Sequence, residues 1–159
     1  MKEIIEALIL NHQTISTMES ATGGFIAHSI TNVEGASEVF SFGAVTYSNQ
    51  YKVQFGVFQE TIDQYSVYSR ETAWEMSRAI SDYTGSTYGV GITGKLNRVD
   101  KNNLYGEDNV VYVSVYDSEK NTYWSDEVVV EKGTREENKE EVLESIILLL
   151  KRVILEKEA

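Results

Sequence analysis

The stretch that decides the fold is residues 14–31, which read TISTMESATGGFIAHSIT. Its first part, Thr14–Met18, predicts a short strand, and its last part, Phe25–Thr31, predicts a helix with apolar residues on one side. Between them lies a tight turn, Glu19-Ser20-Ala21-Thr22-Gly23-Gly24. Two glycines let the backbone approach another group closely, and a helix start presents unpaired N–H groups. The stretch therefore predicts a strand, a turn and a helix that together could hold a ligand.

Strands and helices alternate on both sides of this stretch. The pattern predicts helices at 2–11, around Lys52, at 59–65, at 69–83 with Ser69 as its cap, and from about 134 onward. It predicts strands at 39–47 and 87–93 and a hairpin of 110–116 and 123–130. Residues 95–107 are expected to form an exposed loop. This order predicts an α/β fold, a three-layer α/β/α sandwich with a mixed sheet, helices on both faces and an antiparallel hairpin at one edge. A chain of 159 residues is about one domain, so we expect a single domain over 1–159.

The composition narrows both the compartment and the chemistry. The chain contains no cysteine, which excludes disulfides and thiolate nucleophiles and fits a reducing compartment. The start of the chain, MKEIIE, breaks the apolar run that a signal peptide needs, and no stretch approaches the ~20 apolar residues of a membrane span. We therefore expect a cytoplasmic protein.

The charge of the chain bears on its partners. A net charge of −11 argues against nucleic acid or an anionic membrane surface, because both need a basic surface, but an anionic small molecule can still bind a locally positive site. The two histidines, His12 and His28, lie on different predicted elements and have no carboxylates at ligand spacing. We therefore expect no metal ion and no cofactor, and we favour a helix end for His12 and a solvated helix face for His28.

Without cysteine or a well-placed histidine, a hydrolase would have to activate serine or threonine through lysine. Ser20 lies at a strand-to-helix turn whose following N–H groups could stabilise an oxyanion or hold a phosphate, although Ser20 and Thr22 could equally be helix caps. In the segment 46–52, Tyr47, Asn49 and Lys52 could converge on the same sheet edge, although the segment alone would read as an ordinary turn.

Several motifs occur in order along the chain: Glu19-Ser20-Ala21-Thr22-Gly23-Gly24, Val45-Thr46-Tyr47-Ser48-Asn49-Gln50-Tyr51-Lys52, Gly56-Val57, Gly91-Ile92-Thr93-Gly94 and Gly133-Thr134-Arg135. Together they closely resemble the C-terminal domain of the bacterial CinA (competence/damage-inducible protein) family. Stand-alone members of that family are nicotinamide-nucleotide amidases, also called NMN deamidases. The resemblance implies an amidohydrolase that converts nicotinamide mononucleotide to nicotinate mononucleotide and ammonia in pyridine nucleotide recycling.

Carried over residue by residue, the resemblance implies Ser20 as nucleophile, Lys52 as its base and Tyr47 as a hydrogen-bonding or proton-relay partner. A serine needs a base at neutral pH, and lysine can serve only if burial lowers its pKa. Arg135 suits a ligand phosphate through its fork of donors, and its alternative role is a surface salt bridge. The residues expected to bind the substrate are Thr22, Gly23, Gly24, Asn49, Thr93 and Arg135.

The chain departs from the family pattern in two places. Ala21 stands where the family has a cysteine, and this change does not affect the proposed pair of Ser20 and Lys52. Where the family has a glycine- and proline-rich loop after Gly94, this chain has bulkier residues, of which Lys95, Arg98 or Lys101 would supply positive charge instead. The second hypothesis is therefore a diverged, inactive member that binds a nucleotide or a protein partner. Four aromatic residues lie close together in the sequence and fit either self-association as a homo-oligomer or core packing: Tyr51, Phe55, Phe58 and Tyr65.

Overall fold

The computed structural model describes residues 1–156 and contains a five-stranded sheet in the order β2-β1-β3-β4-β5. Residues 157–159 of the predicted domain lie outside the described residues. The strands are β1 (Ile15–Glu19), β2 (Gly43–Val45), β3 (Tyr88–Gly94), β4 (Val110–Asp117) and β5 (Thr122–Val129). The helices are α1 (Lys2–Leu10), α2 (Phe25–Thr31), α3 (Asn49–Gln54), α4 (Gln59–Tyr65), α5 (Arg70–Thr84) and α6 (Arg135–Leu150), with a short 3-10 turn η1 (Ala36–Glu38) and a π-helical turn η2 (Lys151–Leu155).

The sheet has a parallel half and an antiparallel half. Strand β1 pairs in parallel with β2 on one side and with β3 on the other, so it is a central strand. Strand β4 pairs antiparallel with β3 and forms a hairpin with β5, which is one of the two edge strands. The predicted mixed sheet with an antiparallel hairpin at one edge is therefore confirmed.

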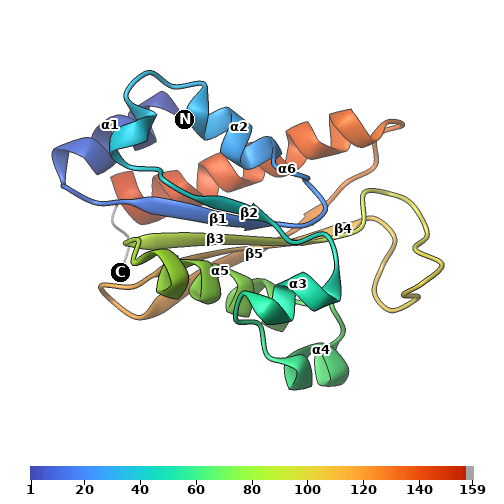
Figure 1. Ribbon diagram of the computed structural model, residues 1–159. Coiled ribbons are helices and arrows are strands. Elements are labelled where there is room, and N and C mark those ends of the chain that lie inside the picture. Colours follow the sequence, from blue (N-terminus) through green and yellow to red (C-terminus); the bar gives the residue numbers. More distant parts are fainter. Residues whose placement is uncertain (157–159) are drawn as a thin grey trace.

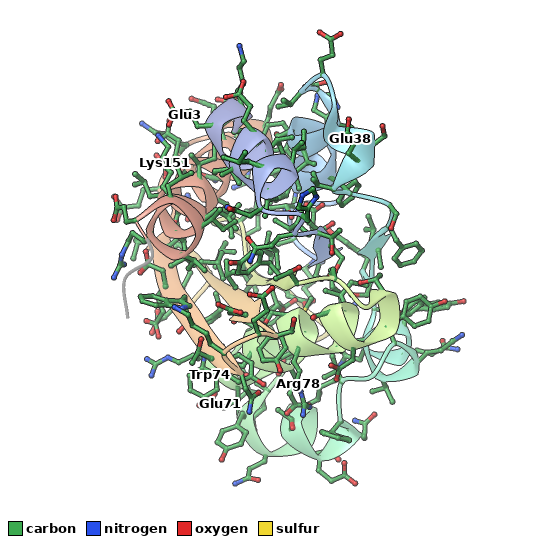
Figure 2. The ribbon with its side chains drawn as sticks, turned by 90° about the vertical axis from the view of Figure 1, so that its left-hand side faces the viewer. Glu3, Glu38, Glu71, Trp74, Arg78 and Lys151 are labelled. Carbon is green, nitrogen blue, oxygen red and sulfur yellow. The ribbon has the colours of Figure 1, made fainter. Side chains whose placement is uncertain are left out.

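Helices cover both faces of this sheet. In Figure 1, α1, α2 and α6 lie on one side of the strands and α3, α4 and α5 lie on the other. Figure 2 shows the same layers after a 90° turn, with Glu3 and Lys151 in one helical layer and Trp74 and Arg78 of α5 in the opposite one. The predicted three-layer α/β/α sandwich is confirmed. No helix among the described residues is long and apolar enough to cross a membrane.

Each helical layer buries its own apolar cluster against the sheet. Ile4 and Leu8 of α1 are fully buried at helical spacing with residues of α2 and α6, and Met76 and Ile80 of α5 do the same on the opposite face. The Ser69 hydroxyl accepts a hydrogen bond from the Thr72 N–H (3.1 Å), which confirms Ser69 as the cap of α5. Periodicity and capping thus place the helices where the sequence predicts them.

The predicted strand at 39–47 is much shorter in the structure. Strand β2 covers only Gly43–Val45, and the chain before it forms η1. At the sheet edge β2 pairs with β1 alone, so one partner supplies all of its ladder bonds. A Cβ at Gly43 would lie 2.5 Å from Thr17 Oγ1, so a residue without a side chain is needed where the two strands meet. The apolar content of 39–47 reflects burial of Val39 against the sheet as well as strand pairing.

Candidate active site

Ser20 lies in the turn directly after the central strand β1. Its N–H donates to the carbonyl oxygen of Ile92 (3.0 Å), so the turn begins while the chain is still bonded to β3. Its carbonyl accepts from the Gly23 N–H (3.0 Å), and Gly23 and Gly24 have φ angles of 60° and 101°, in the left-handed region that glycine tolerates. The Gly23 N–H therefore closes the turn and is not free for an oxyanion.

The buried carboxylate of Glu19 fixes this turn to helix α2. Its Oε1 accepts from the Thr22 hydroxyl (2.6 Å) and the Ile26 N–H (2.9 Å), and its Oε2 accepts from the Ala27 N–H (3.0 Å). These bonds satisfy N–H groups of the first helical turn that would otherwise have no partner. Glu19, rather than Ser20 or Thr22, is thus the side chain that caps α2, a role that sequence spacing did not indicate.

The predicted substrate-binding residues Thr22, Gly23 and Gly24 lie apart from the cavity at Ser20. They line a separate hollow of about 470 Å³ next to His28 and Lys139. The Thr22 side chain is fully buried and bonded to Glu19. The structure therefore does not bring these three residues to the same cavity as the proposed nucleophile.

Lys52 reaches Ser20 from helix α3. Ser48 caps this helix by accepting from the Tyr51 N–H (3.4 Å), and the helix directs Lys52 inward, where the residue is only 2% exposed. Its Nζ lies 3.0 Å from Ser20 Oγ and donates to the carbonyl oxygen of Thr46 (2.7 Å). Within residues 1–156 no carboxylate forms an ion pair with it. Burial lowers the pKa of Lys52 from 10.5 to about 8, so a useful fraction of the amine is uncharged near neutral pH.

Ser20 and Lys52 open onto a cavity of about 600 Å³. Tyr47, Asn49 and Arg135 line the same cavity, although they come from three separate positions along the chain. The other lining residues come from the turn after β1, the start of α3, the 67–68 segment, the end of β3 and the loop that follows it: Ala21, Ser48, Val67, Tyr68, Gly94, Lys95, Leu96, Arg98, Val99, Asp100, Asn102 and Asn103.

Tyr47 and Arg135 face each other at the cavity. An Arg135 nitrogen donates to the Tyr47 hydroxyl oxygen (3.3 Å), and Tyr47 is 65% exposed. Within the described residues, no hydrogen bond joins the Tyr47 hydroxyl to Ser20 or Lys52. Tyr47 is therefore a cavity residue paired with Arg135.

Thr93 is fully buried at the end of β3 and does not line the cavity. Its hydroxyl donates to the carbonyl oxygen of Val67 (2.9 Å), and Val67 does line the cavity. Thr93 therefore holds the 67–68 segment in place.

The expectation of an exposed loop at 95–107 is wrong at its start. Lys95 and Leu96 are buried at 4% and 2% exposure. The Lys95 N–H still donates to the carbonyl oxygen of Val110 (3.1 Å), so sheet pairing continues past β3 and keeps this part of the loop against the protein. In Figure 1 the rest of the loop projects from the end of the sheet where α6 begins. The loop forms a wall of the cavity and leaves it open.

Two further residues shape the site without any signal in the sequence. The Tyr68 hydroxyl donates to Asp100 (2.5 Å), which lowers the pKa of the Asp100 carboxyl, while burial is the main cause that raises the pKa of Tyr68. Asn138 of α6 is 1% exposed and donates to the carbonyl oxygen of Leu96 (3.3 Å), which ties the start of the loop to the helix that carries Arg135. Neither residue stands in a motif, so only the tertiary contacts reveal them.

Residues 1–156 contain no group of three or more His, Asp or Glu side chains placed to hold a metal ion. The chemistry that this arrangement offers is a serine hydroxyl next to a buried amine, at the edge of a cavity lined by polar and cationic side chains.

The fold is similar to solved structures of one superfamily. A Competence-Damaged Protein (CinA) superfamily protein from Klebsiella pneumoniae superposes with a TM-score of 0.84 at 21% identity, covering 98% of this chain and 95% of that protein. A competence/damage inducible protein from Agrobacterium tumefaciens superposes with a TM-score of 0.78 at 24% identity, covering 99% of this chain and 95% of that protein. At these identities the likeness shows the fold.

The sequence itself shows the family. A CinA-like protein of Kosmotoga olearia is 42% identical over 99 residues, which is 58% of this chain and 24% of that protein, so the match spans about a quarter of the relative's length. The sequence profile of the CinA C-terminal domain matches residues 1–154. The chain therefore belongs to the CinA C-terminal domain family.

Proposed function

We propose that the chain is an amidohydrolase that converts nicotinamide mononucleotide to nicotinate mononucleotide and ammonia. The observation that carries the proposal is the contact of 3.0 Å between Lys52 Nζ and Ser20 Oγ at the edge of an open cavity. A serine is a weak nucleophile until a base removes its proton, and a buried lysine with a pKa of about 8 can act as that base.

In the first half of the reaction, the uncharged Lys52 amine accepts the Ser20 proton while Ser20 Oγ attacks the carboxamide carbon. The carbonyl oxygen of Thr46 accepts one amine hydrogen, which leaves the nitrogen lone pair free to face Ser20. Collapse of the tetrahedral intermediate breaks the C–N bond, and Lys52 returns the proton to the leaving ammonia. The product of this half is an ester of nicotinate mononucleotide on Ser20.

In the second half, water attacks the ester with Lys52 again as base, and nicotinate mononucleotide leaves as Ser20 regains its proton. Because the Gly23 N–H already closes the turn, the oxyanion needs other donors. We assign this role to the backbone N–H of Ala21 and the side-chain amide of Asn49, since both residues line the cavity.

The cavity suits a nucleotide in size and charge. A volume of about 600 Å³ lies within the range of roughly 300–1,000 Å³ typical of small-molecule sites. Arg135 offers a guanidinium to the phosphate of the ligand, and Tyr47 orients that guanidinium through the bond of 3.3 Å. The proposed reaction belongs to pyridine nucleotide recycling in the bacterial cytoplasm and needs no metal or cofactor.

The test is incubation of the purified chain with nicotinamide mononucleotide, with release of ammonia and of nicotinate mononucleotide measured together. We expect Ser20→Ala and Lys52→Met to lower kcat by about 10³-fold or more. Ser29→Ala is the matched control, because Ser29 lies on the next helix, donates to the Phe25 carbonyl and is not among the residues that line the cavity. No ammonia from the wild type, or equal release by Ser20→Ala, would sink the proposal.

The alternative is a family member that binds a nucleotide without turnover, favoured by the bulky side chains of the loop after β3. Calorimetric titration with nicotinamide and nicotinate mononucleotides separates the two functions, since tight binding without ammonia release supports the alternative.

Self-association also stays a prediction. Tyr51, Phe58 and Tyr65 are exposed, whereas Phe55 packs against Phe42 in the apolar cluster that contains Met76 and Ile80. Sedimentation of the purified chain tests whether it self-associates.

A further inference from the structure

The charged side chains of the cavity have the opposite balance from the whole chain. Four cations line it, Lys52, Lys95, Arg98 and Arg135, against one acid, Asp100, in a chain of net charge −11. The Asp100 carboxylate is already occupied by the Tyr68 hydroxyl and the Asn102 N–H. A locally positive cavity on an acidic protein favours an anionic ligand.

Lys95 is the most deeply buried cation of the loop wall. Its side chain is 2% exposed, and its Nζ lies 3.4 Å from Asp108 Oδ1, a carboxylate whose own side chain is 50% exposed. Its other neighbour is the Tyr68 ring, whose centroid is 4.9 Å from Nζ. A desolvated ammonium with one long ion pair and one ring contact retains the capacity to donate to a bound anion.

Contacts with the 67–68 segment fix Lys95 in the cavity wall. Side chains alternate along an extended chain, so Lys95 lies on the same side as Thr93, whose hydroxyl binds the Val67 carbonyl. Tyr68, which follows Val67 in the chain, contacts Lys95 through its ring and Asp100 through its hydroxyl. A Cβ at Gly106 would lie 3.1 Å from Tyr68 Cβ, so the far end of the loop also passes close to Tyr68.

We propose that Lys95 is a specificity-determining residue that binds the phosphate group of the substrate. The inference rests on the proposed amidase function and deepens it, because it names the group by which the enzyme selects a nucleotide over the nucleoside that lacks the phosphate. Arg98 and Arg135 flank the same cavity at exposed positions, so Lys95 adds a buried cation to the phosphate contact proposed for Arg135. A charge-assisted hydrogen bond is stronger in the desolvated position that Lys95 occupies.

The test compares kcat/KM for nicotinamide mononucleotide and nicotinamide riboside, which lacks the phosphate, in the wild type, Lys95→Met and Lys101→Met. Lys101 is the matched control, because it lies in the same loop and does not line the cavity. We expect Lys95→Met to lose about 10- to 100-fold on the mononucleotide, mainly through KM, and to change by less than about threefold on the riboside. The Lys101→Met variant should keep the wild-type preference.

Two results would overturn the assignment: an unchanged kcat/KM for the mononucleotide in Lys95→Met, or equal losses of kcat/KM on both substrates. Circular dichroism checks that the variant is folded, and Lys95→Gln replaces it if it is not. If the wild type hydrolyses neither substrate, the proposed function fails, and titration with nicotinate mononucleotide decides on Lys95 separately. Wild-type binding that weakens at least tenfold in Lys95→Met upholds the phosphate site, whereas equal binding or none rejects it.

Discussion

Lys52 Nζ lies 3.0 Å from Ser20 Oγ although 32 positions separate the two residues in the chain. Helix α3 inserts the lysine into a position with 2% exposure, where the carbonyl oxygen of Thr46 is its other hydrogen-bond partner. The contact joins the proposed nucleophile to its proposed base in an environment that disfavours the charged amine.

The rate of the proposed reaction should rise with pH. Because burial lowers the pKa of Lys52 to about 8 and the uncharged amine is the base, kcat/KM should increase about tenfold per unit well below pH 8 and level off above it. A pH–rate profile from 6 to 9.5 with nicotinamide mononucleotide checks this. A profile that is flat or falls over that range would contradict lysine as the base.

The stability of the fold should also depend on pH through Lys52. Its pKa is about 8 in the folded state and 10.5 in an exposed lysine, so between these values the unfolded chain binds more protons and stability rises with pH. Relative to Lys52→Met, the wild type should gain about 1–3 kcal/mol in free energy of unfolding between pH 8 and 10. Urea unfolding of both proteins at several pH values measures the difference, which should be constant if the amine is not desolvated.

Removing the Tyr47 hydroxyl should affect binding more than chemistry. In Tyr47→Phe, Arg135 loses the partner at 3.3 Å, while Ser20 and Lys52 keep theirs. We expect KM to rise about three- to tenfold with kcat within about threefold of wild type. Steady-state kinetics decides, since a loss of kcat comparable to that of Ser20→Ala would instead make Tyr47 a proton relay.

Glu19→Ala should loosen the turn that carries Ser20. The substitution leaves the N–H groups of Ile26 and Ala27 without their acceptor, which should cost about 2–4 kcal/mol of stability and lower kcat as well. Glu38→Ala, at an exposed position of η1, is the control and should stay within about 0.5 kcal/mol. Equal urea midpoints for the two variants would show that the Glu19 cap contributes little.

Gly89→Ala tests the contact between β3 and helix α5. A Cβ at Gly89 would collide with the carbonyl oxygen of Ser77, a backbone atom that cannot move without shifting the helix. The variant should lose about 2–4 kcal/mol, whereas Gly133→Ala, with no atom within 4 Å of the added group, should change by less than about 0.5 kcal/mol. Thermal unfolding of the pair is the measurement, and a Gly89→Ala protein as stable as Gly133→Ala would contradict the close packing.

The sequence predicted where helices and strands lie along the chain more accurately than which segments pack against one another. Residues 25–31 and 59–65 are helices with the predicted bounds, because apolar spacing and turn residues are local properties. The strand at 39–47 was predicted too long, because the same apolar residues can be buried by pairing in a strand or by packing beside one. Burial of Lys95 and Leu96 was missed because it depends on pairing with Val110, which is distant in the chain.

The sequence by itself determined the alternation of strands and helices, the three-layer sandwich, the family motifs and the residue types left for chemistry once cysteine and histidine were set aside. Only the tertiary structure decided which of those residues meet. It brought Ser20, Lys52, Tyr47, Asn49 and Arg135 to one cavity, placed Thr22, Gly23 and Gly24 in another, and buried Lys95 in the cavity wall. The physical reason is that periodicity is set by neighbours along the chain, whereas distance, desolvation and charge balance are set by segments that the sheet brings together.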